Sequence, residues 1–180
     1  MTYVVFVHIP RTGGTRIRYA LDQWDVIQHR TVEQFVEKYG EKWASMESFS
    51  VVRNPFSRAV SMYRFLHGEN SDLSFAEWVK AGMPDRMGCD PVLYRGRKFE
   101  FDVRTPQVDI LSFGGRVGVK NILRFEDMPD GFFEVTGRSI AWSQESDADD
   151  WAKLYDDTSM RIIADLYASD FEVFQYADSQ

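Results

Sequence analysis

The start of the chain joins a strand, a glycine-containing loop and a helix within a short stretch. Residues 3–8 (YVVFVH) form a continuous run of β-branched and aromatic residues, which is typical of a strand buried on both faces. Pro10, Gly13 and Gly14 interrupt the run, and from Thr15 onward apolar residues recur at helical spacing. This order of elements favours a parallel sheet that is covered by helices.

A second strand runs directly into a second helix further along the chain. Residues 49–53 (FSVVR) predict a strand, Asn54 is expected to cap the following helix, and Pro55 suits its first position. Strands that alternate with helices predict an α/β protein with three layers (α/β/α) and a central parallel sheet. Ligands of such sheets bind beyond the carboxyl ends of the strands, so we expect both turns to lie at the same edge.

The rest of the chain carries further signals for helices and strands. The predicted elements are a helix capped by Thr31 with Gln34, a short helix capped by Ser74 with Glu77, a strand near residues 117–125 and helical structure over about 148–171. Residues 82–106 are expected to be irregular. Since no repeat, linker or low-complexity tract divides the chain, we expect a single domain over residues 1–180.

Composition narrows the partners and the compartment of the protein. With 21 Lys and Arg against 28 Asp and Glu, the net charge is −7, which argues against general affinity for nucleic acid or anionic membranes. The chain has one cysteine and therefore no intrachain disulfide, and no stretch is long and apolar enough to span a membrane. Because no signal peptide is evident, we expect a cytoplasmic protein.

The first turn has the features of an anion-binding site. Backbone N–H groups at the start of a helix converge on an anion, and the helix dipole favours negative charge there. Gly13 and Gly14 allow close approach of the backbone and positive φ. Thr12 and Thr15 carry hydroxyl donors, and Arg11 carries a fixed positive charge. An ordinary strand-to-helix turn that contains two glycines is the alternative interpretation.

The second turn indicates a second phosphate rather than a metal ion. No lysine follows the glycines of the first loop, as the nucleotide-triphosphatase motif requires. The second strand ends in Arg53 and not in a magnesium-binding aspartate, and a guanidinium can grip a phosphate with two hydrogen bonds. Ser57 and Ser61 lie on one face of the helix that follows. A structural salt bridge of Arg53 is the alternative, but two anion sites at one edge indicate a ligand with two separate phosphate groups.

Together these motifs resemble the sulfotransferase superfamily, and in particular its carbohydrate branch, which includes heparan 2-O-sulfotransferase-like enzymes. That branch shows a loop of the form HIPKTGGT, and then VRNP followed by an arginine and by serine-x-tyrosine. The resemblance covers nearly the whole chain. The segments that carry it are HIPRTGGT (8–15), VRNPFSR (52–58), SMY (61–63), PQ (106–107), LRFEDM (123–128) and LYASDFEVFQY (166–176).

The resemblance implies a fold, a donor and residues that bind the donor. It implies a three-layer α/β fold related to nucleotide kinases, and the donor 3′-phosphoadenosine 5′-phosphosulfate (PAPS), which leaves as 3′,5′-adenosine bisphosphate (PAP), with no metal. Residues 11–15 would hold the 5′-phosphosulfate, whereas Arg53 and Ser61 would hold the 3′-phosphate. The segment that includes Arg97 and Lys98 would close over the nucleotide, although a solvated loop explains the positive charge of residues 86–104 equally well.

Sulfuryl transfer to an alcohol also requires a base and stabilisation of the leaving oxygen. A histidine titrates in the right range, and His29 lies in the interval where the carbohydrate branch places its base. A capping role next to the predicted helix start is the rival interpretation for His29. His8 is expected to support the loop, and His67 to end a helix. Arg11 stands where the family usually has lysine, and it keeps the positive charge but cannot give up its proton.

Three functions are therefore open from the sequence. The first is a sulfotransferase that acts on a hydroxyl, with a sugar or glycan as the expected acceptor. The second is a small-molecule kinase of related architecture, which the missing lysine and aspartate disfavour. The third is a non-catalytic module that binds PAPS or PAP, for which only the arginine at position 11 argues.

Overall fold

The structure is a computed structural model that describes residues 4–22, 29–67, 72–84, 93–94, 97–98, 102–142 and 151–177. The chain divides into two compact units, each made of two stretches of sequence. Unit 1 comprises Met1–Arg53 and Gln107–Ser143, and unit 2 comprises Asn54–Pro106 and Gln144–Gln180. The single domain over residues 1–180 stays a prediction.

Unit 1 is built on a parallel sheet, as the sequence predicts. Its strands are β1 (Val4–Val7), β2 (Glu47–Val52) and β7 (Asn121–Arg124), in the order β1-β2-β7. Val7 pairs with Ser50, and Val52 pairs with Arg124. Because the three strands are parallel, the segments that follow them leave from the same edge of the sheet, as expected.

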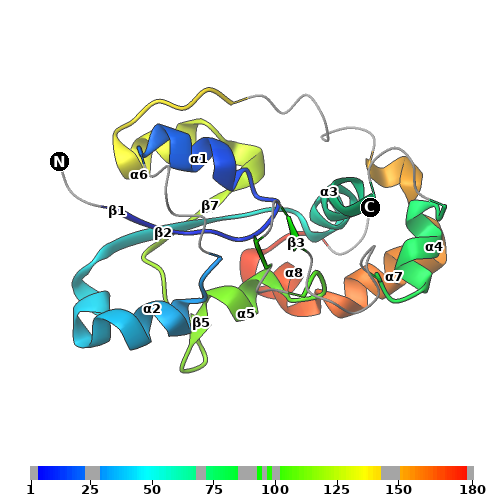
Figure 1. Cartoon of the computed structure of the whole chain (residues 1–180), viewed down its shortest axis with the longest axis horizontal. Coiled ribbons are helices and arrows are strands. Elements are labelled where there is room, and N and C mark those ends of the chain that lie inside the picture. The colour runs from blue at the N-terminus through cyan, green and yellow to red at the C-terminus, as the bar shows by residue number, and fades with distance from the viewer. Residues whose placement is uncertain are drawn as a thin grey trace. The chain divides into compact units, whose positions relative to one another are not determined.

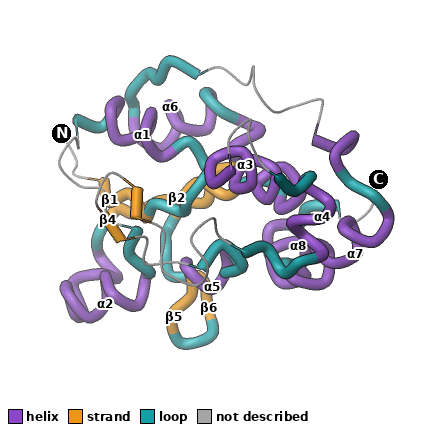
Figure 2. Tube along the Cα trace, turned by 45° about the vertical axis from the view of Figure 1, so that its right-hand side comes forward, coloured by secondary structure: helices purple, strands orange, loops and turns teal. Residues whose placement is uncertain are grey.

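Helices cover both faces of this sheet, which confirms the three-layer α/β architecture. Figure 1 shows α1 (Gly14–Ala20) and α6 (Asp130–Thr136) on one face, and α2 (Val32–Tyr39) and α5 (Gln107–Leu111) on the other. A hairpin of β5 (Ser112–Phe113) and β6 (Arg116–Val117) follows α5 directly (Figure 2).

The predicted strand at residues 117–125 is interrupted in the structure. Gly118 donates its N–H to the carbonyl of Leu111 at 2.8 Å, which takes that residue out of the sheet ladder. A Cβ on Gly118 would lie 2.5 Å from Val32 Cγ1, so close packing against α2 keeps the position small. The sheet strand β7 therefore begins only at Asn121, and a short 3₁₀ helix, η2 (Phe125–Asp127), follows it.

The face of the sheet under α1 and α6 forms an aromatic and aliphatic core. Phe6 and Phe49 stack with ring centroids 5.1 Å apart, and Phe132 of α6 meets Phe49 edge-on at 6.1 Å. Ile17 is the buried apolar residue of α1 in this cluster. Burial of these side chains fixes α1 over the sheet, and with it the position of the loop that precedes α1.

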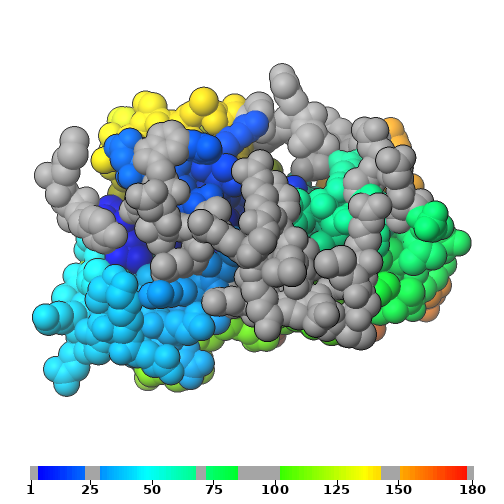
Figure 3. Space-filling view, in the orientation of Figure 1, coloured from blue at the N-terminus to red at the C-terminus, as the bar shows by residue number. Residues whose placement is uncertain are grey.

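The opposite face is covered by an amphipathic helix with a complete capping box. Thr31 accepts from Gln34 N–H at 3.2 Å, and the Gln34 side chain accepts from Thr31 N–H at 2.9 Å, as predicted. Trp43 follows this helix in a 3₁₀ helix, η1 (Gly40–Ser45), and is buried. The outer sides of α2 and η1 form part of the surface in light blue and cyan in Figure 3.

Unit 2 is mainly helical. Its elements are α3 (Pro55–His67), α4 (Phe75–Lys80), the short strands β3 (Leu93–Tyr94) and β4 (Arg97–Lys98), η3 (Trp151–Leu154), α7 (Asp157–Leu166) and α8 (Ala168–Phe174). Asn54 caps α3 by accepting from Phe56 N–H at 2.9 Å, and Ser74 with Glu77 forms the predicted capping box of α4. Within the described ranges, no helix has the length and apolar character needed to cross a membrane.

Candidate active site

The loop between β1 and α1 is held by its own hydrogen bonds and by two left-handed residues. Arg11 and Gly13 have φ angles of 69° and 79°. The Thr12 side chain is fully buried, and its hydroxyl donates to the carbonyl of Ile9 at 2.9 Å. The sequence pattern predicts that this hydroxyl donates to a ligand, whereas in the structure it donates within the loop.

The N-terminal end of α1 has no side-chain cap. Gly13 provides no capping hydrogen bond from a side chain, and the first turn holds no acidic residue. The N–H groups of Arg16 and Ile17 bond to the Gly13 carbonyl at 3.0 and 3.3 Å. Gly14 and Thr15 come before the first residues whose N–H groups bond back along the helix. Their own N–H groups therefore have no acceptor within α1.

This open start distinguishes α1 from the other α-helices in the described part of the chain. Helices α2, α4 and α7 begin with capping boxes, and α3 is capped by Asn54. Helices α5, α6 and α8 carry an acidic residue in the first turn. Because α1 has neither device, the N–H groups and the dipole at its start can interact with an external negative charge.

The charge around this helix start is positive. From His8 to Leu21 the chain contains three arginines and no acidic residue. Arg11 and Arg18 are half-buried, whereas Arg16 is exposed. In a protein with a net charge of −7, this concentration of cations favours an anionic ligand.

Arg53 lies beside the same loop and is held by contacts that connect distant parts of unit 1. Its backbone N–H donates to Gln107 Oε1 at 2.9 Å, and Gln107 Nε2 donates to the Arg53 carbonyl at 2.8 Å. The guanidinium is 4.3 Å from the centroid of the Phe125 ring, and Nη1 donates to the Arg11 carbonyl at 3.3 Å. The structure thus brings Arg53 and Arg11 together, as the sequence analysis expects of the two turns.

The two glycines of the loop are required by packing as well as by the turn. A Cβ on Gly13 would lie 2.2 Å from Trp142 Cη2, and a Cβ on Gly14 would lie 1.8 Å from His8 Nε2. Aromatic rings thus occupy the space next to both Cα atoms. Sequence reasoning identified the glycines through phosphate approach but found neither Trp142 nor this role of His8.

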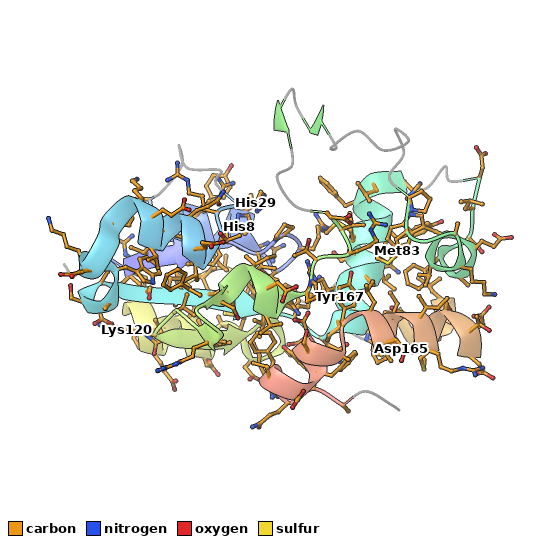
Figure 4. The ribbon with its side chains drawn as sticks, turned by 90° about the horizontal axis from the view of Figure 1, so that it is seen from below. His8, His29, Met83, Lys120, Asp165 and Tyr167 are labelled. Carbon is orange, nitrogen blue, oxygen red and sulfur yellow. The ribbon has the colours of Figure 1, made fainter. Side chains whose placement is uncertain are left out.

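His29 lies next to the loop in a defined orientation. Its Nδ1 is 3.2 Å from the carbonyl oxygen of His8, and the two imidazole rings have centroids 4.3 Å apart (Figure 4). Since a carbonyl only accepts, Nδ1 carries the proton, and in the neutral ring Nε2 carries the lone pair. The cap of α2 is Thr31, so the structure gives His29 no capping role.

His8 is buried at the end of β1, with 7% of its surface exposed. Burial is the main cause that lowers the pKa of His8 well below its usual value, and the neighbouring His29, Arg18 and Arg11 lower it further. The ring is therefore neutral near pH 7. This agrees with the sequence expectation that His8 supports the loop.

The remaining predicted site residues belong to unit 2. Ser61 is buried on α3, and Ser57 donates to the Asn54 carbonyl at 3.2 Å. Arg97 and Lys98 form β4, of which the structure describes only the backbone. The phosphate-binding role of Ser61 and the closing role of Arg97 and Lys98 stay predictions.

Two further expectations about unit 2 can be placed. Arg104, part of the positively charged segment, forms an exposed ion pair with Asp102, whereas Arg86 and Arg95 lie outside the described residues. His67 ends α3, as predicted, and stacks on Tyr63 with ring centroids 5.1 Å apart. In the described ranges, no group of three or more His, Cys, Asp or Glu side chains is arranged to hold a metal ion.

Comparison with known proteins identifies the family. A search of curated proteins and a search of solved structures each found no match. A model of the sulfotransferase family matches residues 4–177, which include both strand-to-helix turns, the open start of α1 and His29. Members of this family are transferases that move a sulfuryl group. Since the match spans nearly the whole chain, the protein belongs to the sulfotransferase family.

Proposed function

We propose that this protein transfers a sulfuryl group from PAPS to a hydroxyl of a sugar or glycan. The observation that carries the proposal is the open start of α1, with no capping side chain and no acidic residue in its first turn. Family membership supports sulfuryl transfer as the reaction. The sugar acceptor rests on the resemblance of both sequence motifs to the carbohydrate branch.

The residues around α1 suit the phosphosulfate end of this donor. Gly14 and Thr15 supply backbone N–H groups in a first turn that holds no acidic residue, and Arg11 adds a guanidinium in the loop before it. When bound, PAPS supplies the sulfuryl group and leaves as PAP. Arg11 would stabilise the negative charge that develops on the phosphate oxygen as its bond to sulfur breaks.

His29 would act as the base for the acceptor hydroxyl. Its Nδ1–H donates to the His8 carbonyl, which directs the lone pair to Nε2. Nε2 takes the hydroxyl proton while the acceptor oxygen forms its bond to sulfur. The reaction therefore balances: the acceptor gains the sulfuryl group, His29 gains the proton, and the leaving phosphate oxygen gains the electron pair.

The roles of Arg53 and Ser61 toward the 3′-phosphate follow from the sequence motif. The contacts of Arg53 support its part, because Gln107 fixes its backbone and Phe125 stacks on its guanidinium next to the loop. Such a preorganised cation loses little freedom on binding an anion. The role of Ser61 rests on its motif position alone.

The two alternative functions, a kinase and a non-catalytic module, predict results that differ from those of a sulfotransferase in the same assay. A kinase would require ATP and magnesium, and its loop would need a lysine that this loop lacks. A non-catalytic module would bind PAP but form no product. The arginine at position 11 keeps the positive charge of the usual lysine but presents it on a wider fork, and it is the one feature that favours this module.

The proposal is tested by incubating the protein with PAPS carrying radioactive sulfur and a panel of sugars and glycans. We expect labelled acceptor and stoichiometric PAP, and we expect His29→Gln to lose most of the rate while it keeps PAP affinity. Binding of PAP with no product from any acceptor would favour the non-catalytic module. Phosphorylated acceptor from ATP and magnesium would favour the kinase.

A further inference from the structure

His8 lies where the loop, α1 and His29 meet, and the proposed reaction gives it no chemical step. We propose that His8 is a positioning residue, whose ring holds the start of α1 through Gly14 and holds His29 in the orientation that presents Nε2. The effect of His8 on catalysis rests on the proposed function. The contacts on which the positioning role rests are present in the protein without any sulfuryl donor or acceptor substrate.

The contact between His8 and Gly14 fixes the start of α1. A Cβ on Gly14 would lie 1.8 Å from Nε2, 2.0 Å from Cδ2 and 2.5 Å from Cε1 of His8. The edge of the imidazole therefore lies directly against the Gly14 Cα, and no side chain fits between them. Because Gly14 supplies one of the N–H groups proposed for the phosphosulfate, a shift of His8 moves a ligand-binding group.

A row of packed rings, stacked from Phe49 through Phe6 to His8 and tilted between His8 and His29, connects His29 to the core of the sheet. The centroid distances are 5.1 Å from Phe49 to Phe6, 5.3 Å from Phe6 to His8 and 4.3 Å from His8 to His29. The carbonyl of His8 also accepts from His29 Nδ1. His8 thus contacts His29 through both its ring and its backbone, which restricts the rotation of the His29 side chain.

Hydrogen bonding at Nδ1 does not explain the presence of His8. Its Nδ1 is buried and has no hydrogen-bond partner in the described part of the chain. A positive charge on the ring would meet Arg11 and Arg18, which already oppose protonation of His8. The imidazole therefore acts through its flat shape and its packing against Gly14, Phe6 and His29.

The test pairs a substitution that displaces the ring with one that removes it. Gly14→Ala forces the ring of His8 away, whereas His8→Ala creates the space that a Cβ at position 14 needs. Gly131→Ala is the matched control, because Gly131 lies in the first turn of α6 and its Cβ would meet Leu123 at an ordinary 3.4 Å. The readouts are the His29 tautomer by long-range proton–nitrogen NMR, thermal unfolding and PAP affinity by calorimetry.

We expect the neutral His29 ring to carry its proton on Nδ1 in the wild type and in Gly131→Ala. We expect the share of the Nε2-protonated form to rise in Gly14→Ala and in His8→Ala, because the ring that packs against His29 is displaced or absent, although the backbone carbonyl of residue 8 remains. A wild-type tautomer in His8→Ala would overturn the positioning role. This readout requires no PAP binding, so absence of PAP binding in the wild type would overturn the proposed function and leave this result to decide about His8.

The double variant tests the contact with Gly14. We expect Gly14→Ala to lower PAP affinity about tenfold and to lower the melting temperature. The double variant should bind PAP and melt like His8→Ala alone, because the clash is gone. If Gly14→Ala does not fold, recovery of a folded chain in the double variant is the expected result. If the losses of PAP affinity and of melting temperature in the double variant equal the sum of the losses in the two single variants, the proposed contact between His8 and Gly14 would be overturned.

Discussion

Helices α1 and α2 lie on opposite faces of the sheet in unit 1 and begin in opposite ways. Helix α2 satisfies its own start, with Thr31 and Gln34 forming a reciprocal capping box and Glu33 in the first turn. Helix α1 begins at a left-handed glycine with no side-chain cap and no acidic residue. The difference teaches that a helix start without a cap, set among arginines, can accept an anionic ligand such as the one proposed, whereas the start of α2 is already satisfied by its own side chains.

The largest effect is expected when α1 is made to resemble α2. Thr15→Glu places a carboxylate in the open first turn, where it competes with the ligand for the same N–H groups. We expect PAP affinity to fall by about 100-fold, whereas the free energy of unfolding stays level or rises by about 0.3–1 kcal/mol. Calorimetry and urea unfolding measure the two effects.

The matched control for this change is Gln34→Glu in the capping box of α2. Glutamate serves equally well at this position of a capping box, so neither PAP affinity nor stability should change appreciably. Wild-type PAP affinity in Thr15→Glu would show that the start of α1 is not the anion site.

Substitution of Arg11 separates charge from backbone conformation. Arg11 has a φ of 69°, which glycine adopts without strain, so Arg11→Gly should keep or raise the stability. We expect its PAP affinity to fall about tenfold or more through loss of charge-assisted hydrogen bonds. Arg11→Lys keeps the charge and should stay within about threefold of the wild type. Equal affinities for glycine and lysine at position 11 would contradict a role for the charge.

Removal of the cap of α2 should affect stability alone. Thr31→Ala deletes the acceptor for Gln34 N–H, so we expect a loss of about 1 kcal/mol in the free energy of unfolding. PAP affinity should stay at the wild-type value, since the cap only completes α2. A parallel loss of PAP affinity would mean that the two helix starts are not independent.

A more gradual effect concerns pH, because α1 packs against a titratable ring and α2 does not. The pKa of His8 is lowered in the folded protein, mainly by burial, so as pH falls below about 6.5 the unfolded chain takes up a proton that the folded chain refuses. Stability should therefore fall on acidification by at most about 1.4 kcal/mol per pH unit from this group. His8→Gln should have a flatter profile in urea unfolding between pH 7 and 5; an unchanged profile would contradict a buried neutral His8.

Local patterns in the sequence were sufficient to predict much of unit 1. The two turns follow from apolar runs that end in Pro, Gly or Asn, and the capping boxes follow from pairs three residues apart. The parallel sheet and its three layers are confirmed. The structure places His29 beside the loop, and its role as the base stays a proposal.

The contacts that hold the site together could not be predicted in this way. Gln107 bonds to the Arg53 backbone through two hydrogen bonds, and Trp142 packs against Gly13. Both contacts join residues far apart in sequence, and no local periodicity encodes such pairs. Helices α5 and α6 are short, so they show too few turns for an apolar stripe to emerge. The buried hydroxyl of Thr12 likewise depends on the folded loop.

Titration calorimetry of the wild-type protein with PAP, run beside ATP with magnesium, tests the central claim most directly. We predict binding of PAP without metal, at a Kd of about 1 to 100 μM, and little or no binding of ATP. Tight binding of ATP with magnesium and none of PAP would contradict the account, because the open start of α1 would then serve a nucleoside triphosphate.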